Sequence, residues 1–371
     1  MVRGPAAFIC QRDSDTNVAM KNRVLCLLFL VVFVSAFALA QSYPANSANS
    51  ATFDADGTAR ITRVISVPSM VSPEAQKWLE SLTKQKYAPE TLTERRQRTD
   101  EWRARDSTEA RRRYPVNIEE SSIAGVRTDI ITPLAMPEAN RVRLLINLHG
   151  GGFNSDSGSL IEGVPIANLA KIKVVSVYYR LAPENRFPAA VEDAVAVYKE
   201  LLKSYKPRNV GIFGTSAGGI LTAEVAVKLK QLGEPLPGAL GLFTMLADFS
   251  RTSDSRQLFA LNGLPGMVEP ADPRRPHDAD YVGQTNSKDP LLSPLYADLH
   301  GMPPSLLVTS TRDMLLSDTC IFHRALLGAG NDAQLVVFEA LPHAFWYHFD
   351  LPETKEALEL MAKFFDEKLE R

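Results

Sequence analysis

The chain has 371 residues, of which 45% are hydrophobic and 23% are charged, and its formal net charge at pH 7 is −2. This is an ordinary globular composition, long enough for one large α/β domain or for two small domains. The balanced charge offers no basic surface for nucleic acid, and three cysteines are too few for a disulfide scaffold. Composition therefore argues against both of those classes.

The first forty residues predict an export signal. Met20-Lys21-Asn22-Arg23 supplies a positive n-region, Val24 to Val34 an apolar h-region, and Ala38-Leu39-Ala40 a small-x-small cleavage site. We therefore assign 1–40 to an upstream segment plus signal peptide, with Gln41 as the mature start. The protein is predicted to be secreted or periplasmic, without stable membrane association after cleavage.

An N-terminal membrane anchor is the alternative that this segment leaves open. Residues 24–40 form a 17-residue stretch, at the short limit for crossing a bilayer. The choice between Met1 and Met20 as the start also stays open. After cleavage only Cys320 would remain, so we expect no internal disulfide and a self-sufficient core.

The next segment predicts a flexible lead-in and a helical cap over 41–113. Residues 41–68 are small and polar, and we expect them to be loosely ordered. Ser72-Pro73 is typical of a helix start, with Ser as the N-cap and Pro at the first helical position. Arg95 to Arg113 carries eight arginines interleaved with acidic residues, a pattern that indicates a solvated helix burying one side.

From residue 114 to 371 the pattern indicates a single domain with an α/β fold. Paired strands are predicted first, followed by apolar runs that alternate with helices, so we expect a mostly parallel sheet covered on both faces. The predicted strands are 116–120, 127–132, 143–148, 174–179, 210–213, 240–246, 305–309 and 334–338. The predicted helices are 188–204, 217–232, 317–327 and 352–369. The proline-rich interval 250–290 is predicted to be an insertion near the pocket.

A G-x-S-x-G pattern lies between a predicted strand and a predicted helix, with Ser216 at its centre. In that context the serine occupies a tight, strained turn and becomes a nucleophile above the sheet edge. Gly214 and Gly218 are required because a Cβ at either position would collide across the turn. The following helix begins at Ala217, and its N-terminus favours developing negative charge.

Three consecutive glycines follow the predicted strand 143–148, in Leu148-His149-Gly150-Gly151-Gly152-Phe153. A serine that attacks a carbonyl creates an oxyanion, which needs preorganised N–H donors. One donor comes from Ala217, and the others come from a glycine loop two sheet positions before the nucleophile. We therefore assign Gly151 and Gly152, with Ala217, to an oxyanion hole.

The nucleophile needs a base, and the base needs an orienting acid, in the chain order Ser, Asp, His. Asp313 follows the predicted strand 305–309, and His343 follows the last predicted strand. Their nearest rivals are Asp318, which together with Ser317 is a candidate N-cap of the next helix, and His348, which lies five residues further on. We assign Asp313 and His343 to the triad.

Taken together, these segments resemble the hormone-sensitive-lipase family of α/β-hydrolases, the bacterial family IV esterases. The resemblance runs from about residue 115 to the C-terminus, and Thr215 before the serine matches the GTSAG subgroup. The acidic segment, Arg312 to Asp318, differs slightly from the D-P-L-x-D form that is commoner in the family. The matching pieces are His149–Gly152, Tyr178–Glu184, Phe187–Ala189, Gly214–Gly219, Ser293–Leu295 and Pro303-Pro304.

The family resemblance implies an α/β-hydrolase fold with an N-terminal helical cap at about 69–113. It also implies that His149 organises the glycine loop and is not a general base, while residues 179–184 brace that loop. No metal or organic cofactor is implied, and the sequence lacks the His/Cys spacing of a metal site.

The predicted function is a serine carboxylesterase that hydrolyses short-to-medium acyl esters through an acyl-enzyme. A lactonase, or a carbohydrate or xenobiotic deacetylase, would use the same triad and stays an alternative. A non-catalytic ligand receptor on this fold is disfavoured because the chain keeps all three triad residues. The polar insertion argues against a lipase lid. The expected partner is a small-molecule ester, and a homodimer is left open.

Overall fold

The computed structural model describes residues 50–156, 158–267 and 279–370. The predicted signal over 20–40 lies outside the described residues. The chain divides into two units, one ending at Ser66 and the other beginning at Val67.

The described part of the first unit is a two-stranded antiparallel hairpin. Strand β1 covers Ser50–Phe53 and β2 covers Ala59–Thr62, and every residue of both strands is exposed. The turn between them places Gly57 at φ +87° and is closed by the Asp54 amide, which donates to the Thr58 carbonyl at 2.9 Å. This stretch is therefore more regular than the loosely ordered segment that the sequence predicts.

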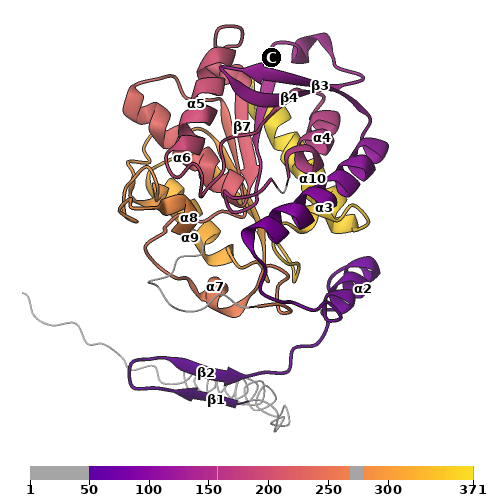
Figure 1. The fold of residues 1–371 in the computed structure, drawn as a ribbon, viewed down its shortest axis with the longest axis vertical. Coiled ribbons are helices and arrows are strands. Elements are labelled where there is room, and N and C mark those ends of the chain that lie inside the picture. Colours follow the sequence, from indigo (N-terminus) through magenta and orange to yellow (C-terminus); the bar gives the residue numbers. More distant parts are fainter. Residues whose placement is uncertain (1–49, 157, 268–278, 371) are drawn as a thin grey trace, which may run out of the picture. The chain divides into compact units, whose positions relative to one another are not determined.

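An eight-stranded sheet forms the centre of the second unit (Figure 1). The strand order is β10-β9-β8-β7-β5-β6-β4-β3; β3 pairs antiparallel with β4 and β4 antiparallel with β6, while the other neighbours are parallel. The mostly parallel sheet of the predicted fold class is thus confirmed. The strands are β3 Val116–Ile123, β4 Val126–Pro133, β5 Leu144–Leu148, β6 Lys173–Val177, β7 Val210–Thr215, β8 Ala239–Phe243, β9 Ser305–Ser310 and β10 Ala333–Phe338.

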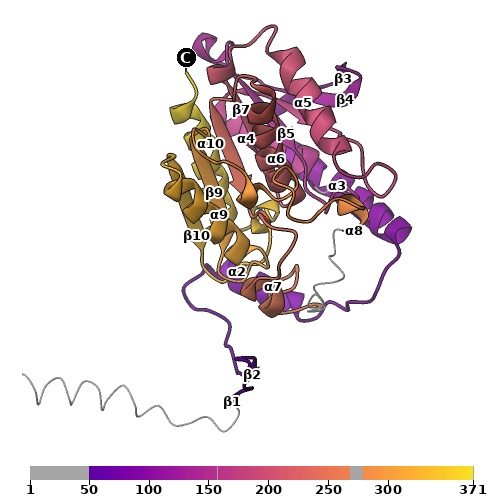
Figure 2. The ribbon, with the colours of Figure 1, turned by 90° about the vertical axis from the view of Figure 1, so that its left-hand side faces the viewer.

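Helices cover both faces of this sheet (Figures 1 and 2). Each face has its own apolar core. One core joins the sheet to α5, α6 and α9, and the other joins it to α4 and α10. The bounds are α4 Ser159–Ala170, α5 Ala189–Leu201, α6 Ala217–Leu232, α9 Leu316–Gly328 and α10 Pro352–Lys368. The sequence predicts four of these helices to within a few residues and does not predict α4.

Two helices precede the sheet, α2 at Pro73–Leu82 and α3 at Leu92–Arg113. The Ser72 side chain accepts from the Ala75 amide, which confirms Ser72 as the N-cap. Thr91 begins α3 with a capping box. The arginine-rich stretch is the helix expected, with Thr99, Ser107 and Ala110 buried and its charged side chains largely exposed.

The insertion between β8 and β9 contains two short helices in its described part, α7 at Asp254–Leu258 and α8 at Ala279–Val282. Its turn at Gly263 lies against the loops that carry the predicted acid and base. A Cβ built on Gly263 would lie 3.4 Å from the Pro342 Cβ and 3.5 Å from the Arg312 Cβ. The insertion therefore contacts the residues just before Asp313 and His343.

Candidate active site

Ser216 occupies the sharp turn between β7 and α6. Its backbone has φ 60° and ψ −122°, a conformation that residues other than glycine rarely adopt. The Ser216 amide donates to the Phe243 carbonyl at the end of β8, at 2.9 Å. The strained turn is thus held by the neighbouring strand, as expected for a nucleophile elbow.

The two glycines of the G-x-S-x-G pattern are required by the neighbouring strand β5. Leu148 at the end of β5 pairs directly with Gly214. A Cβ on Gly214 would lie 2.1 Å from the Leu148 carbonyl oxygen, and one on Gly218 would lie 1.8 Å from it. The predicted placement of the glycine loop two sheet positions away is therefore wrong. β5 is the immediate neighbour of β7, because β6 pairs with the other edge of β5.

The glycine loop follows β5, and its backbone conformation leaves no room for side chains. Gly151 has φ +107°, and a Cβ there would lie 2.1 Å from the Ser155 carbonyl oxygen, while Gly152 has φ +63°. Among the described residues, the amides of Gly151, Gly152 and Ala217 have no hydrogen-bond acceptor. These three N–H groups are thus free to donate to a ligand.

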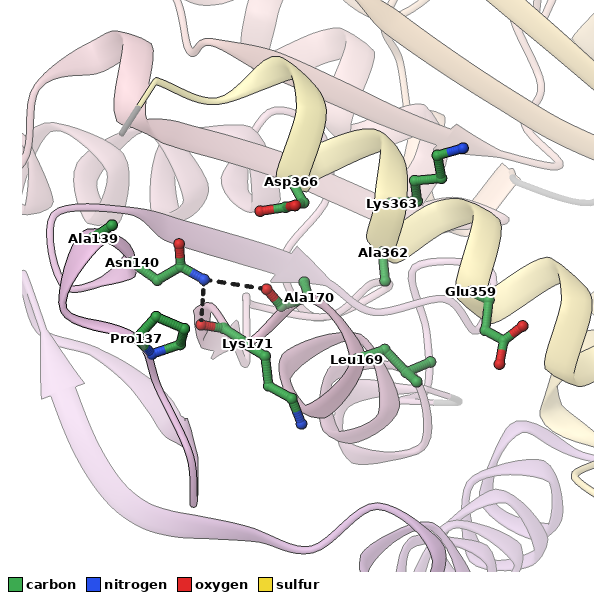
Figure 3. A pocket seen from close by; sticks show the side chains of 10 residues that line it. All are labelled: Pro137, Ala139, Asn140, Leu169, Ala170, Lys171, Glu359, Ala362, Lys363 and Asp366. Carbon is green, nitrogen blue, oxygen red and sulfur yellow. Dashed lines mark hydrogen bonds between the residues drawn. The ribbon is translucent and has the colours of Figure 1, made fainter.

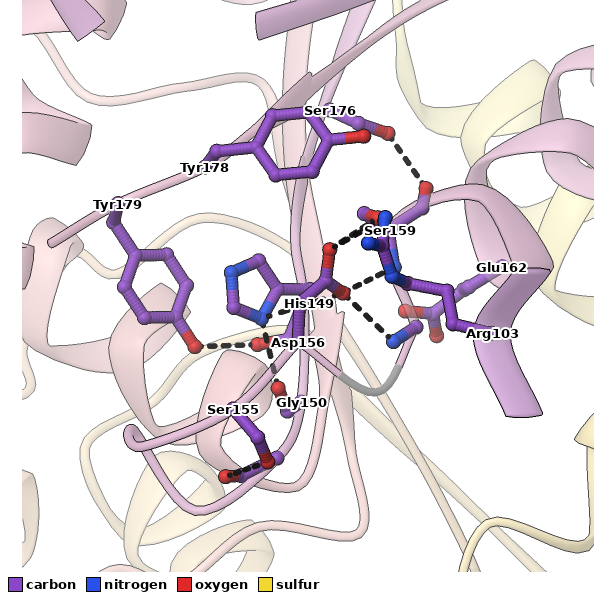
Figure 4. Close-up of polar contacts among 12 residues, drawn as sticks. Arg103, His149, Gly150, Ser155, Asp156, Ser159, Glu162, Ser176, Tyr178 and Tyr179 are labelled. Carbon is purple, nitrogen blue, oxygen red and sulfur yellow. Dashed lines mark hydrogen bonds and ion pairs between the residues drawn. The ribbon is translucent and has the colours of Figure 1, made fainter. Parts of the chain in front are cut away.

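Contacts from the segment after β6 brace the glycine loop (Figure 4). The Tyr179 hydroxyl donates to the His149 carbonyl at 2.7 Å, and its ring stacks on the buried His149 ring at 4.1 Å. The Ala182 amide donates to the Phe153 carbonyl at 2.8 Å. These contacts agree with the bracing role that the family resemblance implies, and burial of His149 agrees with a structural role.

Helix α3 is tied to the same loop by arginine side chains. Arg96 donates through Nε to the Asn154 carbonyl at 2.7 Å and pairs with both oxygens of Glu184 at 2.8 Å. Arg103 forms an ion pair with the buried Asp156 (Figure 4). The distance from Arg103 Nη1 to Asp156 Oδ2 is 3.4 Å. Part of the predicted cap thus directly contacts the loop that offers the free amides.

Asp156 sits at the start of α4 and accepts from the Ser159 side chain at 2.6 Å and from the Gly158 and Ser159 amides at 3.1 Å. Burial opposes its ionisation, but His149, Arg103 and these donors outweigh burial and lower the pKa of the Asp156 carboxyl. An ionised carboxylate therefore anchors the far end of the glycine loop.

Asp313 and His343 lie together, as the sequence predicts. His343 Nδ1 is 2.9 Å from Asp313 Oδ1, and the two side chains are 5% and 1% exposed. Asp313 Oδ1 also accepts from the Leu315 amide at 2.8 Å, and Oδ2 accepts from the hydroxyl of Thr244. Burial opposes ionisation of Asp313, but the charge of His343 and these donors lower the pKa of its carboxyl.

Neither rival residue shares this arrangement. Asp318 accepts from the Ser253 hydroxyl at 2.6 Å, and burial raises the pKa of its carboxyl to about 6. The predicted N-cap role of Asp318 or Ser317 is wrong, since α9 begins one residue before Ser317 and its N-cap is Leu315. His348 is exposed and lies against Trp78 of α2, with ring centroids 4.1 Å apart.

A buried carboxyl below the elbow was not found by sequence reasoning. Glu162 of α4 accepts from the Thr215 hydroxyl and, at 3.0 Å, from Asn147 Nδ2. Its side chain is fully buried, and burial raises the pKa of Glu162 to about 7. The sequence signal that could have indicated such a carboxyl is Thr215, immediately before Ser216. A buried hydroxyl at that position needs a hydrogen-bond acceptor.

Figure 3 shows a surface hollow whose lining includes none of these groups. Its volume is about 410 Å³. It is formed by the residues before β5, the C-terminal end of α4 and helix α10. Asn140 closes its wall by donating to the Ala170 and Lys171 carbonyls. The hollow is therefore at the amino ends of the strands, whereas Ser216, Asp313 and His343 are at the carboxyl ends, where α/β folds place their sites.

The described part of the chain holds no cluster of three or more His, Cys, Asp or Glu side chains arranged to bind a metal ion. In the same residues no helix is both long enough and apolar enough to span a bilayer. The arrangement supplies a serine on a strained turn, an acid–base pair and three free amides. That set defines a protein of the α/β-hydrolase class.

A family model for the alpha/beta hydrolase fold matches residues 145–347. An acetyl-hydrolase of Streptomyces hygroscopicus is 34% identical over 229 residues, 60% of this chain and 75% of that protein. An esterase of Acinetobacter venetianus is 29% identical over 257 residues, 67% of this chain and 82% of that protein. The chain belongs to the α/β-hydrolase fold family.

Solved structures give the same result. A crystal structure of an esterase has a TM-score of 0.72 at 32% identity, covering 83% of this chain and 97% of that one. An esterase from the bacterial hormone-sensitive lipase family has a TM-score of 0.68 at 30% identity, covering 80% and 98%. The resemblance to the hormone-sensitive-lipase family is thus confirmed.

Proposed function

We propose that this protein is a serine carboxylesterase with Ser216 as its nucleophile. The observation that carries the proposal is the strained Ser216 turn standing beside free amides at the carboxyl edge of the sheet. The buried Asp313–His343 pair after β9 and β10 supplies an acid–base partner. Relatives named esterase and acetyl-hydrolase support the same chemistry.

In the first step, His343 Nε2 takes the proton of the Ser216 hydroxyl as its oxygen attacks the ester carbonyl. Asp313 holds Nδ1 at 2.9 Å, which fixes the tautomer and stabilises the imidazolium. The carbonyl oxygen acquires negative charge in this step. We assign Gly151, Gly152 and Ala217 to the oxyanion hole because their N–H groups are unpaired within the described structure.

The second half of the reaction repeats this chemistry with water. His343 first gives its proton to the leaving alkoxide, so that the alcohol departs and the acyl group stays on Ser216. Water then loses a proton to His343 and attacks the acyl carbonyl. The acid is released and the Ser216 hydroxyl is restored, without any metal or organic cofactor in these steps.

The proposed substrates are esters of short-to-medium acyl chains, and acetyl esters are among them. Two of the relatives carry the name acetyl-hydrolase, and the insertion is polar and rich in proline. Turnover of a p-nitrophenyl ester series from two to sixteen acyl carbons tests this range. Faster turnover of emulsified long-chain triglycerides than of soluble short esters would contradict it.

Helices α2 and α3 are proposed to form the cap over this site. The support is their contacts: Arg96 reaches the glycine loop, and Trp78 packs beside the segment that follows His343. Removing residues 41–113 should abolish activity or change acyl preference. Unchanged kinetics on every ester would rule out a cap role.

Export is proposed from the sequence alone, with cleavage after Ala40. N-terminal sequencing of protein recovered outside the cytoplasm should begin at Gln41. A full-length form held in the membrane would favour the anchor. Assembly as a homodimer is a separate proposal that sedimentation of the purified protein would decide.

The nucleophile is tested by covalent labelling with a fluorophosphonate. Wild-type protein should be labelled at Ser216, and Ser216→Ala should lose both labelling and ester hydrolysis. The matched control is Ser204→Ala, at an exposed serine after α5. Labelling that persists in Ser216→Ala would contradict the assignment. Binding of esters without turnover by the wild-type chain would instead indicate a ligand receptor.

A further inference from the structure

Glu162 is a buried carboxyl that the acyl-transfer steps do not use. It lies in the first turn of α4, its side chain is fully buried, and both of its oxygens are engaged. Oε1 accepts from the Thr215 hydroxyl and Oε2 accepts from Asn147 Nδ2 at 3.0 Å. Burying a carboxyl this completely costs folding free energy, so a functional role would explain its presence.

The partners of Glu162 belong to the loops that carry the proposed active site. Thr215 immediately precedes Ser216, and Asn147 lies on β5 two residues before His149. The Thr215 oxygen also accepts from Trp346 Nε1 at 3.2 Å, three residues after His343. One polar network therefore joins the elbow, the base of the glycine loop and the histidine loop beneath the catalytic groups.

We propose that Glu162 is a positioning residue that holds the Ser216 elbow in its productive geometry only while its carboxyl is ionised. The proposal rests on the proposed esterase function. It adds a second proton-dependent group to the reaction, separate from His343. Glu162 acts through Thr215 and does not touch the substrate.

The direction of the hydrogen bonds supports this dependence on ionisation. The chain of donors runs from Trp346 Nε1 to the Thr215 oxygen and from the Thr215 hydroxyl to Glu162 Oε1. Asn147 donates to the other oxygen. An ionised carboxylate accepts both bonds, whereas a proton on either oxygen faces a donor and breaks one of them. Thr215 would then lose the acceptor that fixes its hydroxyl.

The charged and titratable groups around Glu162 leave its carboxyl able to gain and lose a proton. Tyr347 faces it from the histidine loop, and burial raises the pKa of the Tyr347 hydroxyl far above neutrality. Asp156 before α4 is held ionised by His149 and by Arg103 of α3. With burial dominant, the pKa of Glu162 rises to about 7, so its charge changes near neutral pH.

The test is the pH dependence of kcat/KM in wild type and Glu162→Gln, a neutral isostere. In wild type, both His343 and Glu162 must lose a proton, so the slope of log(kcat/KM) against pH on the acid side should approach 2. In Glu162→Gln the slope should fall to 1, with kcat lower by about 10- to 100-fold and KM little changed. Glu359→Gln, at an exposed position of α10, is the matched control and should keep the wild-type profile.

A pair of substitutions at Thr215 tests the link even if Glu162→Gln fails to fold. Thr215→Val removes the hydroxyl but keeps the shape, and it should reduce the slope to 1. Thr215→Ser keeps the hydroxyl and should restore a slope near 2. Folded variants that all retain the wild-type slope would overturn the proposal. Fluorophosphonate labelling of Ser216 in wild type separates this failure from failure of the esterase proposal itself.

Discussion

The most discriminating test of the site compares Asp313→Asn with Asp318→Asn. The chemical change is the same, but the surroundings favour ionisation of one carboxyl and oppose ionisation of the other. Both residues are buried, with 0% and 5% of the whole residue exposed, and they lie five residues apart. Ionisation of Asp313 is favoured by His343 and by its hydrogen-bond donors. Ionisation of Asp318 is opposed by burial and by the nearby Asp248, with Ser253 and Arg256 in partial compensation.

Asp313→Asn should reduce both activity and stability. An amide cannot stabilise the imidazolium, and its NH₂ group would face either His343 or the Thr244 hydroxyl, both of which now meet a carboxylate oxygen. The expected loss in kcat is about 10⁴-fold, as for the equivalent change in a serine triad. Leaving a buried donor without its charged acceptor should lower the free energy of unfolding by about 1–3 kcal/mol.

Asp318→Asn should leave kcat nearly unchanged and stabilise the protein at neutral pH. The pKa of Asp318 is about 6 when folded and 3.8 as its ordinary value. A raised folded pKa means that stability is lost as pH rises from about 4 to about 6, by about 3 kcal/mol in all. An uncharged Asn avoids that loss and can still accept from Ser253.

The measurements are kcat on soluble p-nitrophenyl butyrate and urea unfolding at pH 4 and pH 8. Asp318→Asn should match wild type in stability at pH 4 and exceed it at pH 8. Asp313→Asn should be less stable than wild type at pH 8. A catalytically dead Asp318→Asn beside an active Asp313→Asn would reassign the orienting acid. A loss of stability in Asp318→Asn at pH 8 would refute the electrostatic reasoning.

Three further substitutions, two of them paired with a control substitution, probe the elbow, the cap and the histidine assignment. Gly218→Ala should lower the free energy of unfolding in urea by at least about 3 kcal/mol, because its Cβ would collide with the Leu148 carbonyl. The control, Gly328→Ala at the end of α9, has open space for its Cβ and should be neutral or stabilising. Arg96→Met should lower kcat about tenfold by freeing the glycine loop, and Arg98→Met on the same helix should not. His348→Ala should keep kcat within about twofold of wild type; a dead variant would count against the triad.

The sequence by itself determined the local parts of the site. A strand, G-x-S-x-G and a helix in succession locate Ser216, because only that turn chemistry suits those glycines. Asp313 and His343 follow from chain order, since parallel strands bring their C-terminal loops to one edge. Their 2.9 Å contact in the structure agrees with that placement.

The sequence did not determine features in which tertiary packing overrides local pattern. Helix α4 was missed because it is buried nearly all round and contains Pro165, so neither amphipathic spacing nor propensity marks it. The hairpin at 50–62 was missed because each of its strands has only four residues and lies in a stretch of small and polar residues, although Ala51, Phe53, Ala59 and Ile61 share one face. Its one cue was Asp56-Gly57, a common turn pair.

Only the tertiary structure decided which groups surround the nucleophile. The glycines around Ser216 are fixed by the Leu148 carbonyl, which depends on β5 being adjacent to β7, a matter of strand order. Glu162 is 53 residues from Thr215 in the chain, and its raised pKa comes from burial that no local pattern encodes. Local turn chemistry can be read along a chain, whereas desolvation and contacts between distant segments exist only once the core has closed.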